Sequence, residues 1–310
     1  MKNTCSSHII LILIIFIMKS NIITAQGSIG VNDTGKTQTL NKNWSQDEED
    51  VKATVDQFLI VAGNYDLVAM AEMMAHKASL AIARFKDGGW TTETMLMDDY
   101  FEAAKNSKNR PYYEPLNNYI IHVTEGHLAF LKADGLLHAY GIPLKNNIDY
   151  FTLIKENGIW KFVNLSFTST PIPTDQQTYD TMAFAKGYAQ AWCSQKPDFV
   201  ASFFSEDGSL SVNNGDAAVG RTAITEVAKG FMDAFPDMIV TMDRLLTTPK
   251  GFEFHWTLTG TNTGPNGTGK KVKISGFEIW QLDENGLIKE SKGSFDSEEY
   301  NRQLKFGAVD

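Results

Sequence analysis

The sequence is poor in cysteine and proline, with 2 and 9 residues among 310. The cysteines are Cys5 and Cys193. Because we expect Cys5 to leave with an N-terminal signal, Cys193 would have no partner, which excludes an internal disulfide. Cys193 follows the apolar stretch 189–192, so it is better explained as a core residue than as a nucleophile.

Basic residues are outnumbered as well. The chain has 28 Lys and Arg against 37 Asp and Glu, a formal net charge of -9. It also lacks a basic run or an arginine-rich helix. A protein with this charge is not drawn to polyanions, so we expect no nucleic acid partner.

Long hydrophobic runs are almost missing. The clearest one, residues 9–18, follows Lys2 and is shorter than the roughly 20 residues of a membrane span. Small residues precede a suitable cleavage point after Ala25, which predicts a signal peptide over 1–25 and export to the periplasm or the medium. Cleavage removes Lys2 and Lys19 and no acid, so the net charge moves from -9 to -11. We expect no stable membrane insertion afterwards, with an uncleaved anchor as the alternative.

The sequence shows the pattern of two domains of the same kind. Residues 26–45 are polar and aperiodic and predict a flexible leader. A helical pattern and then alternating segments predict one domain over 46–170, with YIIHVTEG, HLAFLKADG, LLHAYG, NIDYFTLIKENG and IWKFVNLSFTS as separate strands. A Pro-rich linker, 171–177, leads to a second domain over 178–310. ENGIWKFVNLSF at 156–167 and ENGLIKESKGSF at 284–295 share letters at a constant offset of 128, which favours a duplicated α+β domain.

The stretch 251–296 holds the clearest candidate site. Its alternation places one carboxylate, Glu278, in an apolar strand row between Gly276 and Trp280. A carboxylate there must be hydrogen-bonded, neutral or open to a wet pocket, and so it is a candidate functional group. The alternatives are a bulge that turns Glu278 to solvent, or a buried Arg or Tyr that satisfies it.

Residues 178–307 resemble the SnoaL-like polyketide cyclases of the nuclear-transport-factor-2-like superfamily. The resemblance rests on FFSEDGSL, GRTAI, LTGTNTGPNGTGKKV and the ending ENGLIKESKGSFD, and residues 46–170 resemble a more divergent member. It implies two tandem cone-shaped α+β barrels, each with N-terminal helices packed on a curved, mostly antiparallel sheet. In the cyclases an aspartate and a histidine promote ring closure without a cofactor. Here the aspartate position falls at Gly293 and the histidine position near Glu278, while Asp296 lies close by in the sequence.

Three functions follow from these observations. The favoured one is an exported protein that binds a small apolar or amphipathic molecule in a cavity shaped by four aromatic residues, Trp192, Phe203, Trp256 and Trp280. The second is a cofactor-independent isomerase, cyclase or lyase in which Glu278, together with Asp296, transfers a proton. The third is a structural or partner-binding module, as a homodimer or an intrachain pseudo-dimer. No cofactor is expected.

Three histidines of the first domain, His122, His127 and His138, invite a metal interpretation. Their spacings of five and eleven residues match no compact ligand motif, and neither a thiolate nor paired acids join them. We therefore predict no metal site.

Overall fold

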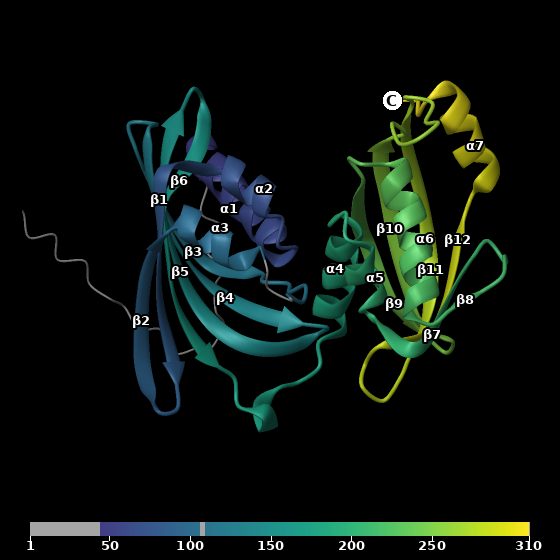
Figure 1. Ribbon diagram of the computed structural model, residues 1–310, viewed down its shortest axis with the longest axis horizontal. Helices are drawn as coiled ribbons and strands as arrows, with labels where there is room; N and C mark the ends of the chain where they lie inside the picture. Colours follow the sequence, from purple (N-terminus) through teal and green to yellow (C-terminus); the bar gives the residue numbers. More distant parts are fainter. Residues whose placement is uncertain (1–43, 106–108, 310) are drawn as a thin grey trace, which may run out of the picture. The chain divides into compact units, whose positions relative to one another are not determined.

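The structure is a computed structural model that describes residues 44–105 and 109–309. The predicted signal peptide and all but the last two residues of the predicted leader lie outside these ranges. In the described part of the chain, no helix is long and apolar enough to cross a membrane. Two six-stranded sheets, each with its own helices and apolar core, confirm the predicted tandem α+β fold (Figure 1).

The N-terminal domain begins with α1 (Gln46–Gly63), whose start is fixed by a capping box. The Ser45 hydroxyl accepts a hydrogen bond from the Glu48 amide, and the Glu48 carboxylate accepts one from the Ser45 amide at 2.8 Å. Two shorter helices, α2 (Leu67–Glu72) and α3 (Met97–Ala104), follow. The predicted apolar stripe of α1 is buried: Val51, Val55, Phe58, Leu59 and Ala62.

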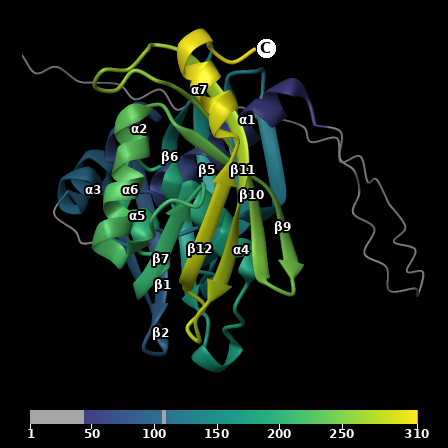
Figure 2. The same ribbon diagram turned by 90° about the vertical axis from the view of Figure 1, so that its right-hand side faces the viewer.

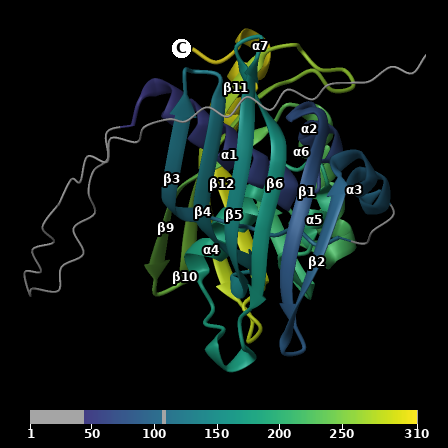
Figure 3. The same ribbon diagram turned by 90° about the vertical axis from the view of Figure 1, so that its left-hand side faces the viewer.

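Six strands form the N-terminal sheet in the order β2-β1-β6-β5-β4-β3 (Figure 3). β1 and β6 run parallel, and the other neighbours are antiparallel. The strands are β1 (Met74–Lys86), β2 (Gly89–Leu96), β3 (Leu116–Thr124), β4 (Leu128–Ala139), β5 (Ile142–Glu156) and β6 (Ile159–Pro171).

The structure corrects the strand prediction at one point. HLAFLKADG and LLHAYG were expected to be separate strands, but β4 runs through Gly135 without a break and pairs there with Leu116 and Asn147. Gly135 is therefore a strand glycine at a place where other side chains come close to the backbone. The sequence analysis also did not predict β2 and α3.

The C-terminal sheet has the same plan, in the order β8-β7-β12-β11-β10-β9, with β7 and β12 parallel (Figure 2). Its strands are β7 (Phe204–Val212), β8 (Ala218–Val219), β9 (Ile239–Thr248), β10 (Gly251–Thr261), β11 (Lys271–Leu282) and β12 (Ile288–Phe295). Its helices are α4 (Thr181–Trp192), α5 (Pro197–Ala201), α6 (Arg221–Ala234) and α7 (Ser297–Phe306).

The repeated letters fall on equivalent strands of the two sheets. They include the turn before each strand, most of β6 and all of β12, and these two strands occupy the same place in the strand order. β6 ends at Pro171 and α4 begins at Thr181, with a short 3-10 turn, Thr174–Gln176, between them. The limits of the two domains along the chain stay a prediction.

Candidate functional site

β11 positions Glu278 as the alternation predicts. Val272, Ile274, Glu278 and Trp280 are buried, while Lys273 and Ser275 on the opposite face are exposed. At Glu278 the register is regular, with Phe254 opposite on β10 and Gly293 opposite on β12. The side chain is 6% exposed, so the bulge alternative does not apply.

Three donors hold one oxygen of the Glu278 carboxyl group. Oε2 accepts hydrogen bonds from Ser291 Oγ at 2.7 Å, from Trp280 Nε1 at 2.9 Å and from Tyr188 Oη at 3.1 Å. Tyr188 Oη also lies 3.4 Å from Oε1. Tyr188 comes from α4 and is fully buried. The alternative that a buried tyrosine satisfies Glu278 is therefore correct in part.

Burial has the largest effect on the pKa of Glu278. It raises the pKa of the carboxyl group above its ordinary value, while the hydrogen bonds from Ser291, Trp280 and Tyr188 act in the opposite direction and are weaker together. A raised pKa favours the neutral acid. Because Oε2 already accepts three hydrogen bonds, we place the proton of the neutral acid on Oε1, where it can be donated.

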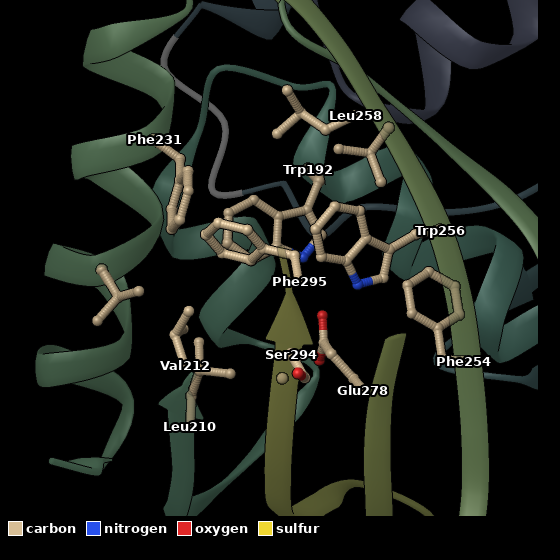
Figure 4. A pocket seen from close by; sticks show the side chains of 13 residues that line it. Trp192, Leu210, Val212, Phe231, Phe254, Trp256, Leu258, Glu278, Ser294 and Phe295 are labelled. Atoms are coloured by element: carbon tan, nitrogen blue, oxygen red, sulfur yellow. The ribbon is translucent and has the colours of Figure 1, made fainter. Parts of the chain in front are cut away.

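Glu278 lines a small pocket in the C-terminal domain (Figure 4). The other lining residues are almost all apolar, and they come from α4, α6 and four strands: Trp192, Leu210, Val212, Val227, Phe231, Val240, Phe254, Trp256, Leu258, Gly293, Ser294 and Phe295. The cavity measures about 50 Å³. That is room for a few water molecules, since one needs roughly 10–15 Å³ by this measure, and it is far below the roughly 300–1,000 Å³ of ligand pockets.

Trp256 packs closely against the neighbouring strand β11. It lies opposite Gly276 in the sheet, and a β-carbon at Gly276 would be only 2.6 Å from Cζ2 of the indole ring. The glycine therefore lets the ring lie against the β11 backbone. Trp256 Nε1 is buried without a hydrogen-bond acceptor in the described part of the protein. Figure 4 shows this nitrogen and one oxygen of Glu278 pointing toward the same part of the pocket.

The four aromatic residues predicted to shape the cavity divide into two groups. Trp192 and Trp256 line it. Phe203 and Trp280 lie behind it: the Phe203 ring packs edge-on against Tyr188, and Trp280 stacks on Phe254 with ring centroids 4.6 Å apart. Trp280 therefore acts on the site through its hydrogen bond to Glu278.

Asp296 has a different place. Its side chain caps α7 by accepting a hydrogen bond from the Glu299 amide at 2.9 Å, and it is exposed. Helix capping accounts for this carboxylate, so we do not carry its tentative catalytic role further.

The sequence analysis missed the hydroxyl donors to Glu278. Tyr188 lies on α4, and nothing in the sequence pairs that helix with β11. Ser291 had a detectable signal, because it lies two residues before Gly293 on the same face of β12. It is 1% exposed, opposite Trp280.

The histidines of the N-terminal domain are not gathered at one place. His122 and His127 are exposed, while His138 is buried near the end of β4. Across the described residues, no group of three or more His, Cys, Asp or Glu is arranged to hold a metal ion.

Residues 183–304 match the family model described as SnoaL-like polyketide cyclase. Among solved structures, one similar protein is a hypothetical protein with a ketosteroid isomerase-like fold from Catenulispora acidiphila, crystallised in complex with trimethylamine. It is 14% identical, with 38% of this chain and 88% of that chain covered and a TM-score of 0.34. An NTF2-like protein of unknown function from Exiguobacterium is 20% identical, with 36% and 95% covered and a TM-score of 0.32.

A third similar structure is a phenazine biosynthesis-related protein from Pseudomonas aeruginosa, 20% identical, with 37% of this chain and 79% of that chain covered and a TM-score of 0.32. No curated protein matches the sequence. The family match extends from α4 into α7, so the SnoaL-like resemblance of the C-terminal domain is confirmed.

Proposed function

We propose that this protein, whose C-terminal domain is SnoaL-like, binds a small apolar molecule that carries a hydrogen-bond acceptor such as a carbonyl oxygen. The observation that carries the proposal is the pair of donors in the C-terminal pocket. In this proposal Glu278 is the neutral acid, which its raised pKa favours, and it donates from Oε1; Trp256 Nε1 is a buried donor with no acceptor among the described residues. A buried donor without an acceptor costs about 1–3 kcal/mol, so an acceptor that reaches both groups is favoured.

The size of the cavity restricts the ligand. With about 50 Å³ available, a molecule larger than a few heavy atoms enters only if an aromatic side chain moves. Trp256 is the expected mobile group, because it is only partly buried and lies beside Gly276. The remaining walls are apolar and hold no charge that would oppose a neutral ligand.

Catalysis by Glu278 is the second candidate. An isomerase must remove a proton next to a carbonyl group and return it, and this needs an ionised base. A neutral Glu278 that donates to the carbonyl oxygen cannot be that base at the same time, and it is the one ionisable residue lining the pocket in the described structure. Binding without chemistry therefore fits this pocket better.

The test uses two probes of similar shape, cyclopentanone and methylcyclopentane. We expect the ketone to bind more tightly by about threefold to tenfold, the value of one net hydrogen bond. Glu278→Leu, which places an apolar side chain there, should reduce the preference, because only the Trp256 donor remains. Glu298→Gln, an exposed acid outside the pocket, is the matched control. Calorimetric titration measures the affinities.

Equal affinity of the two probes, or a preference that Glu278→Leu leaves unchanged, contradicts the binding proposal. The same mixture in deuterated water tests the enzyme alternative by NMR. Accelerated exchange of the protons next to the ketone, lost in Glu278→Gln, would show that Glu278 acts as a base.

Export is part of the proposal and rests on the signal-like segment at residues 1–25. A mature N-terminus near Gln26 in protein recovered from the producing cell supports it. An N-terminus at Met1 in that protein contradicts it.

A further inference from the structure

The N-terminal domain contains a much larger cavity than the C-terminal one. Its volume is about 660 Å³, and all of its lining residues lie between Phe58 and Ser169. This volume falls within the roughly 300–1,000 Å³ of small-molecule sites. Apolar side chains form most of its wall, among them Leu80, Ile82, Met97, Phe151, Leu165 and Phe167.

Register explains why this cavity is open where the other is filled. Phe167 and Phe295 are equivalent in the sequence repeat; Phe167 pairs with Asp149 on β5, and Phe295 pairs with Gly276 on β11. Asp149 is thus the equivalent of Gly276. Its other neighbour, on β4, is Ala133, whereas the neighbour of Gly276 on β10 is Trp256. The N-terminal domain thus has the methyl side chain of Ala133 at the position where the C-terminal domain has the indole ring of Trp256.

The position two residues earlier on β5 and β11 also carries smaller or more polar side chains in the N-terminal domain than in the C-terminal domain. Asn147 pairs with Gly135, whereas the equivalent pair in the C-terminal domain is Ile274 with Leu258. Two large apolar side chains are thus replaced by an amide and a hydrogen atom. At this position along the sheet, the N-terminal domain has polar residues and empty space, whereas the C-terminal domain is filled by apolar side chains.

Two carboxyl groups converge over Gly135. A β-carbon there would lie 2.7 Å from Glu114 Oε1 and 2.7 Å from Asp149 Oδ2. Glu114 Oε1 accepts a hydrogen bond from Asn147 Nδ2. All three polar residues are at least nine-tenths buried, with exposed fractions of 9% for Glu114, 6% for Asn147 and 4% for Asp149. The glycine thus makes room for an acid pair rather than for a turn.

Two acceptor oxygens of this cluster are unsatisfied. Asp149 Oδ2 and Asn147 Oδ1 are buried and have no hydrogen-bond partner within the described ranges. Native proteins leave few buried polar atoms unpaired. Both residues line the cavity, so a molecule inside it that carries N–H or O–H donors satisfies them directly.

Nearby positive charge offsets only part of the effect of burial on the acid pair. Burial is the main cause that raises the pKa of both Glu114 and Asp149, and the Glu114 charge raises that of Asp149 further. Lys145 acts on Glu114, and Lys132 and Asp134 act with opposite signs on Asp149. Of the nearby basic residues, Lys132 is paired with Asp134 and Arg84 with Glu93. Arg110 and Lys145 also line the cavity.

We propose that the N-terminal cavity is a second binding site, for an amphipathic amine whose ammonium group lies between Glu114, Asn147 and Asp149 and whose apolar part fills the rest. An ammonium group has three donors and one positive charge. It satisfies both free oxygens and the acid pair together, which a neutral alcohol with one donor does not. The site is independent of Glu278 and of the ligand proposed for the C-terminal domain.

The probes are 2-phenylethylamine and 2-phenylethanol, which share one shape and differ in charge. Titration calorimetry of the full chain should show the amine binding about tenfold or more tightly than the alcohol at pH 7, because the ammonium neutralises a buried acid. Asp149→Asn keeps the shape and should weaken amine binding by about tenfold, with alcohol binding almost unchanged. The matched control is Asp87→Asn, an exposed acid of the same domain, in a turn with φ of 52° that asparagine tolerates.

Proton release provides a second readout that a merely structural role of Asp149 would not move. A bound ammonium lowers the pKa of both carboxyl groups, so binding at pH 7 should release protons, and the measured heat should differ between phosphate and Tris buffers. Amine affinity should rise from pH 5 to pH 8 as the pair ionises. Three results overturn the proposal: an alcohol that binds as well as the amine, unchanged amine binding in Asp149→Asn, or no amine binding at millimolar concentration.

Discussion

Replacing Glu278 by Gln tests the central feature of the C-terminal domain. The carboxamide keeps the shape of the side chain, and its oxygen can take over the hydrogen bonds from Ser291, Trp280 and Tyr188. Its amide protons then point where we place the proton of the neutral acid. Glu278→Gln therefore resembles the protonated wild-type side chain and removes only the ability to ionise.

The expected stability difference depends on pH. The folded-state pKa of Glu278 is raised, so its contribution to stability is fully present below the unfolded value of about 4.3 and is lost as the pH rises through the folded value. At pH 4 both proteins hold a neutral group, and we expect their free energies of unfolding to agree within about 1 kcal/mol. At pH 8 the variant should be the more stable one, by about 1.4 kcal/mol for each unit by which folding raises the pKa.

Urea unfolding at pH 4, 6 and 8, followed by circular dichroism and tryptophan fluorescence, measures this difference. A variant that loses stability relative to wild type as the pH rises would show that the three donors stabilise the anion more than burial destabilises it. A loss of about 3–5 kcal/mol at pH 8 would mean that Glu278 neutralises a buried cation. Either result refutes the assignment of a neutral acid.

Three further predictions follow. Tyr188→Phe should lower the free energy of unfolding by about 0.5–1.5 kcal/mol if Glu278 is neutral, and by about 1.5–3 kcal/mol if it is ionised, as measured by urea unfolding. Trp256→Ala should enlarge the C-terminal cavity, lower stability by about 3–5 kcal/mol and admit a ring-sized ketone, as measured by unfolding and by calorimetry. Asp296→Ala should cost about 0.5–2 kcal/mol through the lost cap on α7 while ligand affinity stays unchanged, as measured by thermal unfolding and titration.

Strand alternation made Glu278 predictable. A period of two fixes which side chains share a face, and one carboxylate in an apolar row is visible in the letters alone. The same test applied to β5 would have found Asn147 and Asp149, because they share a face with the buried Phe151 and Leu153. The sequence analysis identified that strand but did not sort its faces.

Contacts between elements were not predictable in this way. Tyr188 donates to Glu278 because α4 packs against the sheet at one particular rotation, and no local pattern encodes that rotation. The break expected in β4 failed for a related reason. Gly135 looks like a turn signal until Glu114 and Asp149 are seen to occupy the space beside it.

The two domains share one strand arrangement but contain two different kinds of site. Through the repeat, Leu165 of β6 matches Gly293 of β12, and their partners Phe151 and Glu278 are therefore equivalent. The acid on β5, Asp149, comes two residues before Phe151, about 6.6 Å away along the strand. Both acids are buried, but three donors already hold Oε2 of Glu278, whereas Asp149 Oδ2 has no hydrogen-bond partner among the described residues.

The hydrogen-bonding state of the buried acid, and not its presence, then decides what each cavity recognises. A site with free donors selects a ligand with an acceptor, and a site with free acceptors selects a ligand with donors and positive charge. Because a mismatched ligand leaves buried polar atoms unpaired on both sides, the two cavities should discriminate against each other's ligands. Cross-titration decides this: cyclopentanone affinity that falls in Asp149→Asn, or 2-phenylethylamine affinity that falls in Glu278→Leu, would show that the two sites are not separate in specificity.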